Sequence, residues 1–114
     1  MSDRLPAHLE VSGLIRAVQA AGGFATVLAK GERDAGTLLV ICCHNDGQGR
    51  AWERMPRADG TRGWMLARRQ DNPTDSAEFS EFWQRRKRQD SDLWVLELDV
   101  VDAERFIGIT GTSG

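Results

Sequence analysis

An uninterrupted apolar segment near the middle of the chain, Thr37-Leu-Leu-Val-Ile-Cys-Cys43, constrains the fold more than any other feature of the sequence. Its β-branched residues favour a β-strand. A strand that alternates polar and apolar residues exposes one face, whereas a continuously apolar strand is buried on both faces. The segment therefore predicts a central strand of a β-sheet.

Four further segments have the character of strands, and turns rich in glycine, asparagine and aspartate separate them. These predicted strands span residues 24–30, 49–55, 63–68 and 93–99. After the central strand, Asn45-Asp46-Gly47 is a hairpin signal, because these residue types tolerate positive φ. The first four strands in chain order are expected to form an antiparallel meander.

Two helices are expected, one before the first four strands in the sequence and one after them. Residues 7–21 carry apolar side chains at helical spacing, and Gly22-Gly23 ends this helix. The second helix begins with a first turn capped by either Asn72 or Asp75, and it ends near Gln89.

The order of elements, α-β-β-β-β-α-β, predicts an α+β fold in which an antiparallel sheet of four to five strands packs two helices on one face. The last strand has to pair, because a lone strand leaves its backbone groups without partners. At a sheet edge it would offer a seam for a dimer. Residues 1–114 are expected to form one domain, with residues 1–5 and 108–114 frayed.

Several features point to the cytoplasm. No apolar run approaches the roughly 18 residues of a membrane-spanning helix, and the first residues lack the cationic and apolar parts of a signal peptide. Cys42 and Cys43 are adjacent in a strand, so their side chains point to opposite faces and do not bridge each other. The thiols are expected to stay reduced, and no membrane partner is expected.

Basic and aromatic residues alternate in the third predicted strand. Arg50, Trp52 and Arg54 are spaced two residues apart and therefore line one face. Trp64 and Arg68 of the fourth strand are placed beside them. Such a face suits bases that stack on indoles while arginines contact phosphates. The structural alternative is a sheet face partly covered by a helix, with arginine stems lying along the tryptophans.

A second basic cluster, Arg85-Arg86-Lys87-Arg88, ends the second helix. Cations there stabilise the helix dipole without any ligand, although they also suit phosphate contacts. The net charge of −2 counts against a dedicated nucleic-acid binder. The charges are unevenly distributed along the chain, with a basic middle, residues 50–88, and an acidic end, residues 89–114. These two segments either attract each other in the fold or recruit a charged partner.

The sequence predicts no catalytic residue, metal or cofactor. It contains no nucleophile elbow, phosphate-binding loop or dinucleotide fingerprint. Cys42, His44 and His8 are too few for a structural zinc site. The carboxylates Glu97, Asp99, Asp102 and Glu104 are interpreted as an exposed acidic strand end, and a small metal-dependent hydrolase using Glu97 and Asp99 is the alternative.

Two stretches of the chain carry a family resemblance. They are Ala21-Gly22-Gly23-Phe24-Ala25 with the following Lys30-to-Gly36 turn, and Asp90-Ser91-Asp92-Leu93-Trp94-Val95-Leu96-Glu97-Leu98 after the basic helix. In these residues, and over roughly residues 4–107, the chain resembles a family of short, mostly alphaproteobacterial proteins that is described only as a domain of unknown function. The resemblance implies no activity, ligand or site residue.

Four tryptophans in 114 residues favour a non-catalytic protein-interaction module, with a homodimer as one form of it, because surface indoles often anchor interfaces. The alternative is a nucleic-acid-associated protein that binds phosphates and bases through the basic and tryptophan-bearing face. The candidate binding residues are Arg50, Trp52, Arg54, Trp64, Arg68, Arg85, Arg86 and Arg88.

Overall fold

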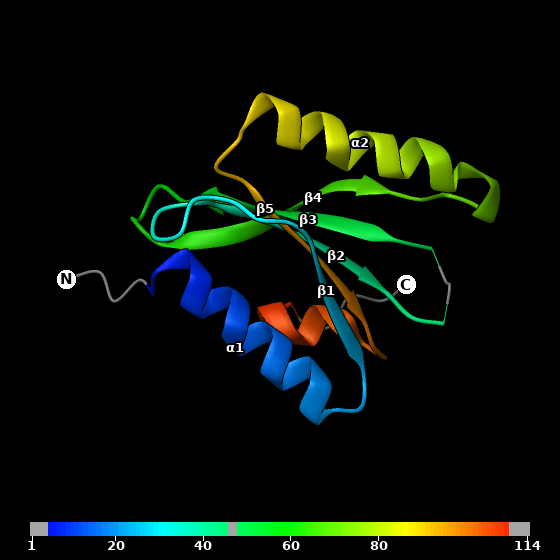
Figure 1. The fold of residues 1–114 in the computed structure, drawn as a ribbon, viewed down its shortest axis with the longest axis horizontal. Helices are drawn as coiled ribbons and strands as arrows, with labels where there is room; N and C mark the ends of the chain where they lie inside the picture. The colour runs from blue at the N-terminus through cyan, green and yellow to red at the C-terminus, as the bar shows by residue number, and fades with distance from the viewer. Residues whose placement is uncertain (1–4, 46–47, 110–114) are drawn as a thin grey trace.

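A computed structural model describes residues 5–45 and 48–109 of the chain (Figure 1). Its elements are α1 (Ala7–Ala20), β1 (Phe24–Ala29), β2 (Leu38–Cys43), β3 (Arg50–Pro56), β4 (Arg62–Arg69), the 3-10 helix η1 (Pro73–Asp75), α2 (Ser76–Gln89), β5 (Trp94–Asp99) and the 3-10 helix η2 (Ala103–Ile107). The α+β class and the predicted element order are confirmed. The turn predicted at Asp46-Gly47 and the chain ends 1–4 and 110–114 lie outside the described residues.

The five strands form one mixed sheet in the order β1-β5-β2-β3-β4. Only β2, β3 and β4 form a meander, since β5 inserts between β1 and β2. It pairs antiparallel with β1 and parallel with β2. The expectation of a four-strand meander is therefore wrong, and β5 does not occupy the sheet edge that a dimer seam would need. Helix α2 carries the chain from the β4 edge back to the sheet centre, as a parallel pairing requires a crossover connection.

The helices lie on opposite faces of the sheet, with α2 on one side and α1 with η2 on the other (Figure 1). The prediction that both helices share one face is wrong. The central strand explains the difference, because Leu38, Val40 and Cys42 point toward α1 while Leu39 and Ile41 point toward α2. All five are buried. A strand that is apolar on both sides needs a covering layer on both sides.

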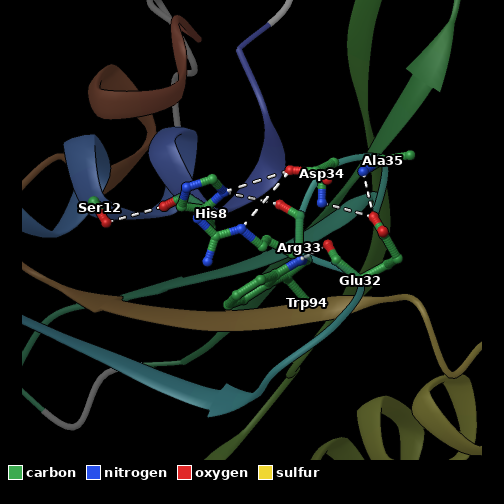
Figure 2. Close-up of polar contacts among 7 residues, drawn as sticks. All are labelled: His8, Ser12, Glu32, Arg33, Asp34, Ala35 and Trp94. Carbon is green, nitrogen blue, oxygen red and sulfur yellow. Dashed lines mark hydrogen bonds and ion pairs between the residues drawn. The ribbon is translucent and has the colours of Figure 1, made fainter.

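The loop between β1 and β2 closes the N-terminal end of α1 (Figure 2). The amides of Ala7 and His8 donate to the carbonyls of Asp34 and Arg33, at 3.0 and 2.9 Å. The carboxylate of Glu32 accepts the amides of Asp34 and Ala35, and these bonds lower its pKa. The first amides of α1 thereby find the acceptors that a helix itself does not provide.

The entry to α2 uses the first of the two predicted caps. The side chain of Asn72 accepts a hydrogen bond from the Thr74 amide at 3.1 Å and begins η1. Asp75 occupies the position before α2 but makes no capping hydrogen bond with its side chain. Among the described helices, none is long and apolar enough to cross a membrane.

Candidate binding site

The four tryptophans differ in their exposure. Trp94 is buried, and its indole N–H donates to the Glu32 carbonyl at 2.7 Å (Figure 2). Trp52, Trp64 and Trp83 are half-buried. None of the four is fully exposed, so three indoles remain that a partner molecule can reach in part.

Four of the predicted site residues do share the α1 side of the sheet. Trp52 and Trp64 both pack against the core on this side. Arg54 lies directly opposite Trp64 in the β3–β4 register, and its guanidinium sits 4.4 Å from the centre of the Trp64 ring. Arg50 lies on this side as well, because its guanidinium donates a hydrogen bond to Glu104 of η2. The two-residue spacing on β3 was sufficient to predict this face.

Arg68 does not join them. The β3–β4 register shifts between Ala51 and Trp52, where β4 contains one extra residue, Ala67. This bulge reverses the alternation, so Arg68 pairs with Ala51 and lies 5.8 Å from the Phe82 ring on the α2 side. The expectation that Arg68 lies beside Trp64 is wrong for this reason.

The basic end of α2 is divided among several partners. Arg86 binds the Glu53 carboxylate of β3 with both terminal nitrogens. Arg85 pairs with Glu81 one turn earlier at 2.8 Å, on the exposed side of the helix. Lys87 donates to carbonyls of residues 30, 91 and 93. Arg88 is exposed. The cluster thus anchors the helix end rather than forming one continuous cationic surface.

Glu104 is a buried carboxylate that sequence reasoning placed among exposed acidic residues. Arg50 binds both of its oxygens, through Nη2 at 2.9 Å and through Nε, and the Trp52 indole donates to it at 3.1 Å. Burial opposes its ionisation, but these hydrogen bonds and the Arg50 charge outweigh burial and hold the pKa of Glu104 below its ordinary value. This pair joins the basic middle of the chain to its acidic end.

The lowered pKa of Glu104 predicts a pH dependence of stability. Above the ordinary value of 4.5 its contribution to the free energy of unfolding is complete. As the pH falls from there through the lower pKa of the folded state, the unfolded chain binds more protons and the contribution is lost. Urea unfolding at several pH values between about 6 and 3 measures the free energy of unfolding at each pH. Plotted against pH, this free energy should fall less steeply for Glu104→Gln than for the wild type. Equal slopes would contradict the assignment.

A pocket of about 380 Å³ opens between α1, η2 and the β3–β4 pair. We call it the Trp64 pocket. Apolar residues of α1 and η2 form one side of the pocket. Polar and aromatic residues of α1, β3 and β4 form the opposite side. The residues that define it here are Leu9, Glu10, Leu14, Arg54, Trp64, Phe106 and Ile107. Helix α1 leans toward β1, which leaves this half of the sheet open.

Arg54 is the polar centre of the Trp64 pocket. Its side chain is only 9% exposed, and its Nη2 binds the Glu10 carboxylate. Arg62 of β4 reaches the other oxygen of Glu10 at 3.6 Å. The Nε of Arg54 is buried and has no hydrogen-bond partner, and no other buried side-chain nitrogen or oxygen of the described residues is in this state.

The residues considered for metal chemistry lie apart or bind elsewhere. Cys42 is buried, and burial raises the pKa of its thiol. His8 contacts the Arg33 carbonyl at 3.1 Å, and His44 lies 3.8 Å from Asp99. Within residues 5–45 and 48–109, no group of three or more histidine, cysteine or acidic side chains is arranged to hold a metal ion.

Residues 5–108 match the profile of a family described as a protein of unknown function, DUF1491. The chain belongs to the DUF1491 family. This confirms the resemblance drawn from the residues around Gly22-Gly23 and Trp94, and it extends over almost the predicted range. No curated protein matches the chain.

Solved structures of DUF1491 proteins from Caulobacter crescentus CB15 share the fold. The crystal structure is 34% identical with a TM-score of 0.77, and the match covers 92% of this chain and 96% of the other. An NMR structure from the same organism is 33% identical with a TM-score of 0.76, covering 90% and 91%. A solution structure of an A. tumefaciens protein is 32% identical with a TM-score of 0.71, covering 87% and 88%. Both organisms are alphaproteobacteria, as the resemblance predicts.

Proposed function

We propose that this DUF1491 protein is a non-catalytic protein-interaction module whose Trp64 pocket receives an apolar side chain of a partner protein. The observation that carries the proposal is the pocket itself, which combines apolar walls with a volume of about 380 Å³. Pockets of roughly 300–1,000 Å³ with mostly apolar walls and a few polar groups are the usual form of a small-molecule or cofactor site, and a pocket of this size also accommodates a single side chain of a partner protein.

The rim of the pocket favours a protein partner. Leu5 and Leu9 line the pocket and are 57% and 47% exposed. Leu66, on the same side of the sheet as Trp52, is exposed as well. Burying these side chains against an apolar group contributes a hydrophobic free energy of about 25 cal/mol per Å² of apolar surface, which is partly offset by the entropy lost on association. Arginine and tryptophan, the types that meet at Arg54 and Trp64, are frequent anchors of protein interfaces.

The polar groups of the pocket support binding rather than catalysis. Glu10 and Arg54 form an ion pair with each other. A general base needs a free lone pair within reach of a substrate proton, and a nucleophile needs such a base beside it. Because Glu10 is occupied by Arg54 and approached by Arg62, it is arranged as a structural counter-ion.

The nucleic-acid alternative loses most of its support at the same residues. Arg50, Arg54 and Arg86 each bind a carboxylate within the chain. A phosphate backbone would have to displace these carboxylates, because an ion-paired guanidinium releases few counter-ions on binding nucleic acid. The overall charge of −2 adds to this argument.

Affinity capture with two matched variants tests the proposal. Leu9→Lys places a charge at the pocket, whereas Val101→Lys places the same charge at a similarly exposed apolar residue that does not line it. Tagged wild-type and variant proteins are incubated with a lysate of the native cells, with and without nuclease. We expect the wild type to capture a partner protein whose amount does not change on nuclease treatment. Leu9→Lys should capture at least tenfold less of this partner, and Val101→Lys should capture as much as the wild type.

The remaining outcomes separate the alternatives. A captured protein that both variants retain equally would refute the pocket as the binding site. Capture that is lost on nuclease treatment would favour nucleic acid. If the pocket-dependent partner is a second copy of this chain, the module is a homo-oligomer. Circular dichroism of both variants controls for loss of the fold.

A further inference from the structure

We propose that the group bound in the Trp64 pocket is the C-terminal residue of a partner chain, with its apolar side chain against the pocket walls and its free carboxylate on Arg54. This inference rests on the proposed function, because it specifies the ligand of the same site. It is argued from one unsatisfied donor, from the local charges and from the size of the pocket.

The unsatisfied donor is the Nε–H of Arg54. Buried side-chain donors in folded proteins are almost always hydrogen-bonded, and an unpaired one destabilises the protein. Arg54 lines the pocket, its side chain is nine-tenths buried, and its Nε has no acceptor within the described residues. The nitrogen is itself closed to solvent, so a ligand that draws the Arg54 side chain toward the pocket and brings an acceptor to this nitrogen removes an existing penalty. Such a ligand therefore binds more tightly than a purely apolar group of the same shape.

The charges around Arg54 favour an anionic acceptor. Glu10 is approached by two guanidinium groups, those of Arg54 and Arg62, so the carboxylate on this side of the pocket already has two cationic partners. Hydrogen bonds between a guanidinium and a carboxylate are roughly twice as strong as those between neutral groups. A ligand cation, by contrast, would meet Arg54 directly and be repelled. The pocket thus selects an acceptor that carries a negative charge.

The size of the pocket decides which carboxylate can reach this donor. Leu9, Leu14 and Phe106 supply apolar walls and Arg54 a polar one to the same space of about 380 Å³. One residue of the ligand must therefore supply both the apolar side chain and the acceptor. An internal apolar residue supplies only a neutral carbonyl. Only the last residue of a chain joins an apolar side chain to its own carboxylate, and capture of a terminal carboxylate is a known mode of peptide recognition.

The first experiment compares free and amidated peptides on the wild-type protein. Pentapeptides with the common start acetyl-Gly-Ser-Gly-Ser end in leucine, isoleucine, phenylalanine or methionine, each as the acid and as the amide. We expect at least one acid to bind tenfold or more tightly than its amide, since loss of a charge-assisted hydrogen bond weakens binding by about this factor or more. In 15N-edited NMR spectra, the Arg54 Nε–H and Trp64 indole signals should shift with the acid.

The second experiment removes the unsatisfied donor and keeps the positive charge. Arg54→Lys retains the positive charge beside Glu10 but lacks the Nε–H and the planar guanidinium. We expect this variant to bind acid and amide within about threefold of each other. The matched control is Arg69→Lys on β4, at an exposed residue that does not line the pocket, and it should keep the tenfold preference. If Arg54→Lys does not fold, the acid-amide comparison on the wild type decides alone.

Three results would overturn the inference: equal binding of every acid and its amide, binding of acids without a shift of the Arg54 signal, or no binding of any peptide up to about 1 mM. These failures differ from failure of the proposed function. If the peptides fail but a captured protein still depends on Leu9, the pocket binds a partner by another group. When capture is insensitive to Leu9→Lys, the proposed function itself is refuted.

Discussion

Glu104→Ala is expected to lower the free energy of unfolding by about 3 kcal/mol, because removing one partner of a buried ion pair leaves the other charge uncompensated. Glu104 is buried and accepts hydrogen bonds from Arg50 and Trp52, so the substitution leaves both donors without an acceptor. Arg50 retains partial access to water, which places the effect at the low end of the range for such pairs. Denaturation in urea measures the loss.

The control for this prediction is Glu81→Ala. Glu81 forms an exposed pair with Arg85 on α2, and pairs of this kind contribute about 0.5 kcal/mol or less. Similar losses for the two variants would show that the Glu104 pair is no stronger than a surface pair.

A second consequence of Glu104→Ala concerns peptide binding. The hydrogen bond between Glu104 and Arg50 holds η2 against β3, and η2 supplies Phe106 and Ile107 to the Trp64 pocket. Glu104→Ala should therefore also weaken peptide binding.

Gly31→Ala is expected to destabilise the protein by about 3 kcal/mol, the upper range for an overpacked site. A Cβ at Gly31 would lie 2.6 Å from the carbonyl carbon of Leu93 and well inside van der Waals contact of the Asp92 carbonyl oxygen. These are backbone atoms next to β5, which lies inside the sheet and cannot move away without disturbing its neighbours. Thermal and urea unfolding measure the effect.

Gly13→Ala is the matched control, since it adds the same atom where, among the described residues, nothing beyond the backbone of α1 itself lies within 4 Å. Gly13 lies in the middle of α1, where alanine is a better helix former by roughly 0.5–1 kcal/mol. The same chemical change is therefore expected to stabilise one site and destabilise the other. A loss of stability at Gly13, or no loss at Gly31, would contradict the packing described here.

Most elements of the fold could be predicted because their signals are local. The apolar run at 37–43 and the periodicity of residues 7–21 identify a strand and a helix from neighbouring residues alone. The insertion of β5 between β1 and β2 could not be predicted in this way. Strand order depends on which distant segments pair, and β5 has apolar residues for both faces wherever it is placed. Burial of 37–43 on both faces did contain the signal for helices on both sides of the sheet.

The candidate site was predicted only in part. Alternation along β3 correctly placed Arg50, Trp52 and Arg54 on one face, and Trp64 joins them across the strand pair. A single extra residue in β4 moved Arg68 to the other face, and no local pattern marks that bulge. The pocket walls from α1 and η2 come from opposite ends of the sequence, so sequence reasoning missed the Trp64 pocket entirely.

The sequence by itself determined the type and order of the elements and the side of β3 on which its arginines lie, since backbone preference and strand alternation are properties of adjacent residues. Only the tertiary structure decided which carboxylates those arginines meet. Glu10 is 44 residues from Arg54, and Glu104 is 54 residues from Arg50. Pairing at such separations depends on strand order and helix placement, and these in turn decided that one buried Arg54 nitrogen has no acceptor among residues 5–45 and 48–109.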